Sequence, residues 1–108
     1  MPRLPFSGSR FLRWRGISGR DYVVSVYPIG KCPDYTDAVV IAVDSRSGSR
    51  VWVGESGAGG RALAEKLASA KRRGADEVHL HLLAATPQER QAAIGDLDPG
   101  EQDLDPGE

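Results

Sequence analysis

The chain has 108 residues, of which 40% are apolar and 27% are charged, and its formal net charge is −1. This length holds one domain with a single modest core, and the longest apolar run, residues 38–43, is far shorter than the roughly 20 residues of a membrane-spanning helix. The lone Cys32 excludes an internal disulfide and, with no apolar signal segment at the N-terminus, predicts a cytoplasmic protein.

The charge is unevenly distributed along the chain. Residues 1–20 contain five arginines and no acid, whereas residues 96–108 contain six acids and no base. Residues 1–95, which form the body of the protein without that acidic segment, carry about five more basic than acidic residues. Such a body favours a polyanionic partner. The alternative is that these arginines only solvate a sheet edge and a helix face.

Hydrophobic periodicity predicts five strands and two helices. In chain order we expect strands over 10–15, 21–27, 38–44 and 50–55, a helix from about 60 to 73, a strand over 77–83 and a helix after Thr86. The predicted fold is therefore α+β, a small and mainly antiparallel sheet with two helices, in the order strand, strand, strand, strand, helix, strand, helix. One domain spans 10–95, between a flexible N-terminus (1–9) and a disordered acidic tail (96–108) that repeats DLDPGE.

Alternation within the strands predicts which side chains share a face. The nearly continuous apolar run of the third strand is typical of a central strand covered on both faces. In its partner strand, Val51 and Val53 should share one face and Trp52 should occupy the other. In the last strand His79 and His81 share a face. Histidines so spaced can chelate a metal, but no third ligand lies near them in sequence, and we predict neither a metal nor a cofactor.

Local signals mark the helix ends. Gly74 is the expected stop of the first helix, and Thr86 with Glu89 forms a predicted capping box at the start of the second. The buried stripes are predicted to consist of Leu63, Leu67 and Ala70 in the first helix and of Ala92, Ala93 and Leu97 in the second.

Residues 50–61, RVWVGESGAGGR, run from a strand through a glycine-rich loop to a helix N-terminus, where free amides favour anions. No Lys-Ser or Lys-Thr pair closes the loop as a P-loop requires, and a hairpin strand does not suit a dinucleotide site. Two interpretations stay open, a phosphate site and a tight reversal that needs glycine. The candidate phosphate-binding residues are Gly54, Gly57, Gly59, Arg61, Arg50 and Lys66.

Three short patterns within residues 39–97 carry a family resemblance. Trp52 to Gly54 reads Trp-Val-Gly, Arg61 follows seven residues after Gly54, and GADEVHLHLL precedes TPQERQAAIGDL. These patterns resemble the GIY-YIG nuclease domain. They stand where that family has its Tyr-Ile-Gly motif, its catalytic arginine, and the third strand with the helix that carries a metal-binding glutamate.

The resemblance implies metal-assisted phosphodiester hydrolysis, in which tyrosines orient water, an arginine stabilises charge and a glutamate holds a divalent ion. This chain has no tyrosine in the first motif, Trp52 in place of the second, and Gly95 and Asp96 where the glutamate is expected. We therefore assign no catalytic residue and predict a degenerate GIY-YIG-like domain that binds a phosphate-bearing partner such as nucleic acid. The alternatives are an interaction module that self-associates through the edge of the N-terminal hairpin, and an active metal-dependent nuclease.

Overall fold

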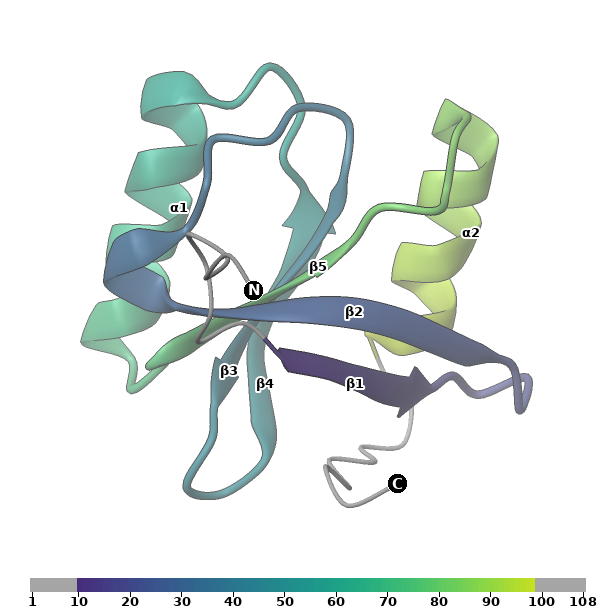
Figure 1. Ribbon diagram of the computed structural model, residues 1–108, viewed down its shortest axis with the longest axis horizontal. Coiled ribbons are helices and arrows are strands. Elements are labelled where there is room, and N and C mark those ends of the chain that lie inside the picture. The colour runs from purple at the N-terminus through teal and green to yellow at the C-terminus, as the bar shows by residue number, and fades with distance from the viewer. Residues whose placement is uncertain (1–9, 99–108) are drawn as a thin grey trace, which may run out of the picture.

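The computed structural model describes residues 10–98, which form one antiparallel sheet and two α-helices (Figure 1). The predicted flexible N-terminus (1–9) and the predicted tail from residue 99 onward lie outside the described residues. No helix within residues 10–98 is long and apolar enough to cross a membrane. The elements are β1 (Arg10–Arg15), β2 (Asp21–Pro28), the 3-10 turn η1 (Ile29–Lys31), β3 (Val39–Asp44), β4 (Ser49–Glu55), α1 (Gly60–Arg72), β5 (Glu77–His81) and α2 (Pro87–Leu97).

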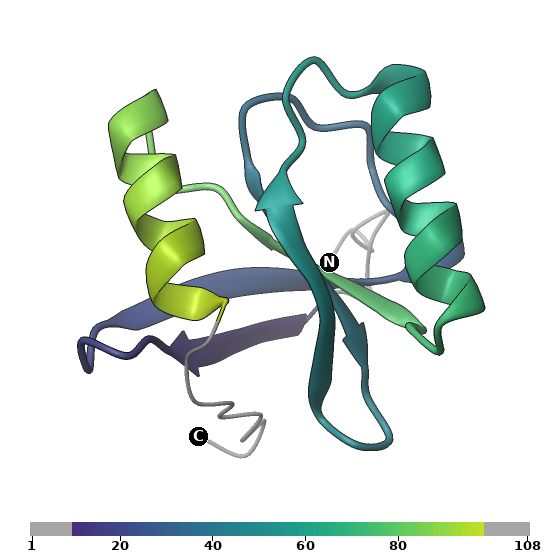
Figure 2. The ribbon, with the colours of Figure 1, turned by 180° about the vertical axis from the view of Figure 1, so that it is seen from behind.

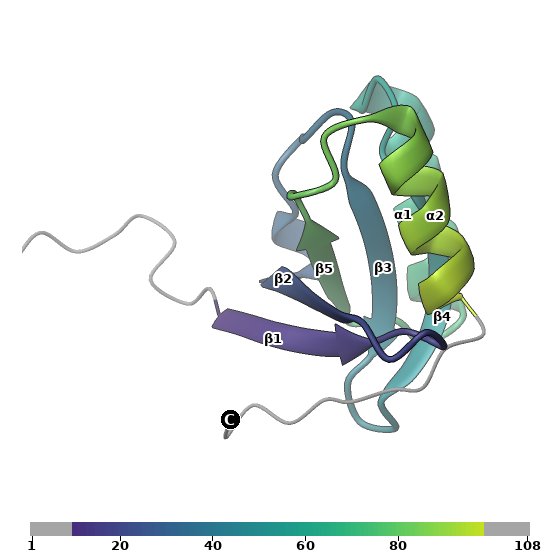
Figure 3. The same ribbon diagram turned by 90° about the vertical axis from the view of Figure 1, so that its right-hand side faces the viewer.

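The α+β fold class and the order of the elements are confirmed. The strand order in the sheet is β1-β2-β5-β3-β4, and every neighbouring pair is antiparallel. β5 is the last strand in sequence, yet it inserts between the two hairpins and pairs with both β2 and β3. Hairpin β1–β2 runs across hairpin β3–β4, so the sheet is strongly twisted (Figures 1 and 3).

The two helices pack on opposite faces of β3. Val39, Ile41 and Val43 lie in the core cluster that α2 joins, whereas Val40 and Ala42 face the clusters under α1. Seen from behind, hairpin β3–β4 stands between the two helices (Figure 2). β3 is therefore a central strand covered on both faces, as its continuous apolar run predicted.

The predicted face of Val51 is wrong. Val51 packs with Trp52 against Ala42 and the C-terminal half of α1, whereas Val53 packs on the other face. The register between β3 and β4 shifts between Ala42 and Val43, where β4 carries an extra residue. Such a bulge breaks the strict alternation on which the prediction rested.

The C-terminal elements differ from expectation in their limits and in one face. β5 ends at His81, so Leu82 and Leu83 lie outside it and are exposed. In α2, Ala92 is exposed and Arg90 is buried in its place. The helix runs to Leu97, two residues past the predicted domain limit at 95, and Leu97 is buried as the predicted stripe requires.

The predicted helix signals are confirmed. Leu63, Leu67 and Ala70 are the buried residues of α1, and Gly74 follows it at φ +108°, a conformation that glycine adopts without strain. At the start of α2, the Glu89 amide donates to the Thr86 hydroxyl and the Thr86 amide donates to the Glu89 carboxylate, which completes the capping box.

A buried hydrogen bond links the edge strand β1 to β5. The indole N–H of Trp14, which is fully buried, donates to Nδ1 of His79 over 2.8 Å. On the other side of the ring, Nε2 of His79 lies 3.0 Å from Oε1 of Glu77. These contacts hold hairpin β1–β2 against the centre of the sheet.

Trp14→Phe should therefore destabilise the domain. The substitution keeps most of the aromatic volume but removes the indole N–H, and removing one partner of a buried hydrogen bond costs about 1–3 kcal/mol. We expect a decrease of that size in the free energy of unfolding measured with urea. Trp52→Phe is the matched control, since the Trp52 indole makes no hydrogen bond within residues 10–98. Equal losses in the two variants would contradict the role given to this bond.

Candidate functional site

The turn from β4 to α1, residues 54–60, which we call the glycine corner, is fastened to the start of β3. The Ser56 amide donates to the Ala38 carbonyl, and the Ala38 amide donates to Oγ of Ser56, each over 2.9 Å. Gly57 (φ +56°) and Gly59 (φ +72°) adopt left-handed conformations that favour glycine. Both glycines thus have a conformational role in the reversal from strand to helix.

The N-terminus of α1 is already in contact with a carboxylate of the chain. The Gly60 amide donates to Oδ1 of Asp34 over 2.9 Å. Gly59, the N-cap residue, has no side chain to cap the helix, and a Cβ at this position would crowd the Asp34 carboxylate. Asp34 therefore satisfies one of the free amides that attract anions to helix N-termini, and a phosphate here would compete with it.

Gly54 has a packing role. A Cβ at this position would overlap Cζ2 of Trp52, so the absence of a side chain gives the indole its place. Trp52 is half-buried against the α1 clusters, and Nζ of Lys66 lies 6.0 Å from the centre of its ring. The tight-reversal interpretation of the corner therefore accounts for Gly54, Gly57 and Gly59.

The structure does not bring Arg50 together with the other candidates. Because of the bulge in β4, Arg50 lies opposite Val43, and its guanidinium lies 5.2 Å from the centre of the Trp14 ring on the α2 side of the sheet. Burial lowers the pKa of Arg50. Lys66 and Trp52 lie on the α1 side, so Arg50 and Lys66 are separated by the sheet.

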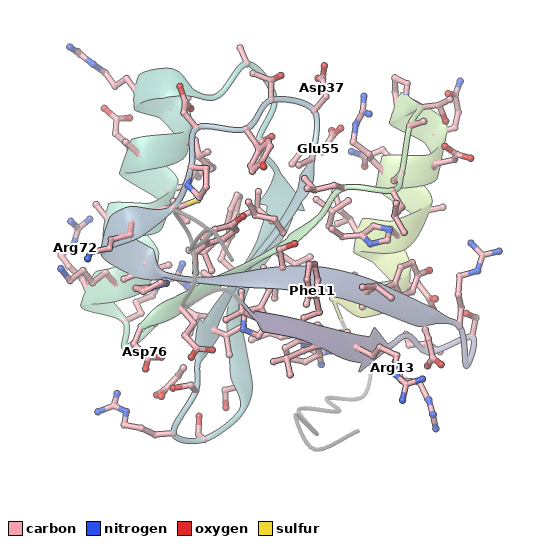
Figure 4. The ribbon with its side chains drawn as sticks, viewed as in Figure 1. Phe11, Arg13, Asp37, Glu55, Arg72 and Asp76 are labelled. Carbon is pink, nitrogen blue, oxygen red and sulfur yellow. The ribbon has the colours of Figure 1, made fainter. Side chains whose placement is uncertain are left out.

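The exposed side of α1 carries a set of basic residues, which we call the basic face. One acid, Glu65, lies among them. None of these cations takes part in an ion pair with any residue from 10 to 98, and Figure 4 shows Arg72 directed away from the body. Unpaired cations on one helix create a positive local field. The basic face consists of Arg61, Lys66, Lys71 and Arg72 of α1 and of Arg73 at its C-cap. Lys66 lies on the flank near Trp52, and Lys71 lies on the opposite flank, beside η1.

The histidines of β5 share a face, as predicted, but they are engaged in the core. His79 bonds to Trp14 and Glu77, and Nδ1 of His81 donates to the Val23 carbonyl over 2.9 Å. Within residues 10–98, no group of three or more potential ligands is placed to hold a metal ion.

Asp96, the carboxylate nearest to the glutamate position that the resemblance implies, is held by hydrogen bonds. It accepts from the Ser18 hydroxyl (2.7 Å), the Ser18 amide (2.8 Å) and the Tyr22 hydroxyl (2.8 Å). The Ser18 side chain is the main reason that the pKa of Asp96 lies below its usual range. These bonds join the end of α2 to the β1–β2 turn, which is a structural role.

Sequence reasoning missed a second polar cluster, where α2 meets β4. Nε of Arg90 donates to Oε2 of Glu55 over 2.7 Å, Nη1 donates to the Ala84 carbonyl over 3.3 Å, and Gln91 donates to Oε1 of Glu55 over 2.9 Å. Asp37, at φ +56°, lies 3.9 Å from Nη2 of Arg90 (Glu55 and Asp37 are labelled in Figure 4). One sequence signal could have revealed this cluster. Arg90 lies three residues before Ala93, so helical periodicity places it on the buried stripe of α2.

Cys32 lies beside a cavity of about 390 Å³ between η1 and α1. Burial, with a smaller effect of the Asp34 charge, raises the pKa of the Cys32 thiol to about 11. The side chain is therefore a neutral thiol at physiological pH, which is a poor nucleophile.

Comparison of the chain with protein-family models, with curated proteins and with solved structures found no match. The structure is a small α+β domain. The polar side chains of β5 and α2 form hydrogen bonds within the domain, such as His79 with Trp14 and Arg90 with Glu55. The basic side chains of α1 lie on its exposed side.

Gly54→Ala tests the packing role of this glycine. The new methyl group must displace the Trp52 ring, and overpacking of this kind costs about 1–3 kcal/mol. We expect that decrease in the free energy of unfolding, measured with urea. Gly30→Ala is the control, because no heavy atom lies within 4 Å of its added Cβ. It should leave stability unchanged or slightly raised. A Gly54→Ala variant as stable as wild type would contradict the packing role.

Asp96→Asn should change how stability depends on pH. The pKa of Asp96 is lower in the folded state than the value near 3.9 typical of unfolded chains. Its stabilising contribution is therefore present above about pH 4 and is lost as the pH falls through the folded-state pKa. We expect the stability difference between wild type and Asp96→Asn to shrink from about pH 6 to pH 2 in urea unfolding. The control is Asp98→Asn, because the Asp98 side chain makes no hydrogen bond within the described residues. It should show a smaller change.

Proposed function

We propose that this chain is a non-catalytic binding domain that takes a phosphate-bearing partner, such as nucleic acid, through the basic face of α1. The observation that carries the proposal is the set of five exposed cations, four on this helix and one at its C-cap, accompanied by one acid and free of ion pairs within residues 10–98. Such cations bind a phosphate backbone by releasing its condensed counterions.

In this proposal the phosphate contacts lie on the outer surface of α1 and not at the glycine corner. Asp34 already meets the Gly60 amide, which weakens the corner as an anion site. Arg61 and Arg72 are eleven residues apart, about three helical turns, and so project from the same side of α1. Two cations spaced in this way suit an extended anion better than a single phosphate group.

The resemblance to the GIY-YIG nuclease domain supports the same proposal. The hairpin β3–β4, helix α1, strand β5 and helix α2 follow one another in the order that the resemblance implies. Of the residues associated with cleavage, Arg61 remains, whereas Trp52 and Gly95 replace a tyrosine and a glutamate. An arginine without a base or a metal ligand favours binding over hydrolysis.

Self-association is the second candidate function, and the position of β1 at a sheet edge favours it. Unpaired edge groups can add a strand from another chain. A mass in light scattering that rises with protein concentration would support this candidate. Arginines in β1 oppose it, because charged side chains on an edge discourage pairing.

The double variant Arg61→Gln/Arg72→Gln should bind a short DNA duplex more weakly than wild type. Each lost phosphate contact should make the plot of log affinity against log salt shallower by about 1 unit. Fluorescence anisotropy with a labelled duplex, from low to physiological salt, measures both effects. The matched control is Arg46→Gln, which also removes an exposed cation, but one that Asp44 pairs at 3.1 Å. No duplex binding by wild type at low salt, or equal losses in test and control, would refute the proposal.

A further inference from the structure

One face of hairpin β1–β2 carries exposed apolar side chains. In the register of the sheet, Phe11 lies opposite Ser25, which lies opposite Leu80, so these three residues share the face that α1 covers farther along. Leu80 is buried in the cluster with Leu63 and Leu67, whereas Phe11 is 70% exposed. The helix therefore covers one end of this sheet face and leaves the other end open.

The open end presents a row of three apolar residues on adjacent segments. Val23 is two residues before Ser25 in β2, and Leu82 is two residues after Leu80, immediately past the end of β5. Val23 and Leu82 are each 42% exposed. We call Phe11, Val23 and Leu82 the apolar row. Exposed apolar side chains that lie together on one sheet face can form an interaction surface.

Two arginines and one acid lie beside the apolar row, and this net positive charge favours an anionic partner. Arg13 and Arg15 alternate with the buried side of β1 and so share the face of Phe11 (Phe11 and Arg13 are labelled in Figure 4). Oδ2 of Asp21 lies 3.7 Å from Nη1 of Arg13, and Oδ1 of Asp21 lies 3.5 Å from Nε of Arg15. Both ion pairs are exposed and therefore contribute little to stability. Pairing of two β1 edges would bring arginines of two copies together, which disfavours a second copy of the chain.

We infer that this open face binds single-stranded nucleic acid, with Phe11 stacking on an unpaired base and Arg13 and Arg15 contacting neighbouring phosphates. An exposed aromatic ring on a sheet, flanked by arginines, is the arrangement that binds single strands with little dependence on sequence. A duplex keeps its bases stacked and offers none to Phe11. The inference rests on the proposed nucleic-acid binding, but it uses residues outside the basic face of α1.

The test measures the affinity of Phe11 variants for a labelled oligothymidylate and for a duplex of equal length, by fluorescence anisotropy at low salt. Phe11→Leu keeps an apolar side chain but removes the π-face, and should weaken single-strand binding by about 5- to 150-fold. Phe11→Trp should preserve it. Both variants should bind the duplex as wild type does. Ile17→Ala is the control for loss of exposed apolar surface, since Ile17 is 63% exposed in the β1–β2 turn.

The outcomes separate this inference from the proposed function. Single-strand affinity that is unchanged by Phe11→Leu, or reduced equally by Ile17→Ala, overturns the inference and leaves the role of α1 intact. Single-strand binding that depends on Phe11, together with duplex binding that does not depend on Arg61 and Arg72, supports the inference and refutes the proposed role of α1. A glutamate-rich peptide of equal charge that competes as well as oligothymidylate also overturns the inference, because attraction by charge alone would then explain the binding.

Discussion

The hydrogen bond between Trp14 and His79 is the interaction on which the packing of the sheet depends. An indole N–H can only donate, so Nδ1 of His79 accepts and the proton of the neutral imidazole lies on Nε2, facing Glu77. One partner comes from the edge strand and the other from the strand that joins the two hairpins. The bond therefore holds together parts of the sheet that backbone pairing alone leaves two strands apart.

The two helices are attached in different ways, and this difference bears on function. α2 has a thin apolar stripe, and hydrogen bonds of Arg90 to Glu55 and of Asp96 to Ser18 hold its two ends. Its key polar groups are thus used inside the domain. α1 packs through leucines and alanine and leaves its cations outside, where a partner can reach them. The same asymmetry makes α1 the better candidate for a binding surface.

The candidate site was only partly predictable. The sequence located the glycine corner and placed Arg61 in the first turn of the following helix, because turn residues and helix periodicity are local signals. It could not show that Asp34, 26 residues before Gly60, contacts the helix N-terminus. Nor could it place Arg50 on the face opposite Lys66, since a bulge changes the alternation without a clear mark in the sequence.

The sequence by itself determined the type and approximate limits of each element, the buried stripe of α1 and the capping box of α2. These features depend on interactions over a few residues, which periodicity and capping residues encode directly. Only the tertiary structure decided that β5 enters between the two hairpins, and that Arg90 replaces Ala92 on the buried side of α2. Those outcomes depend on contacts between distant segments, such as Trp14 with His79, and local preference carries no information about them.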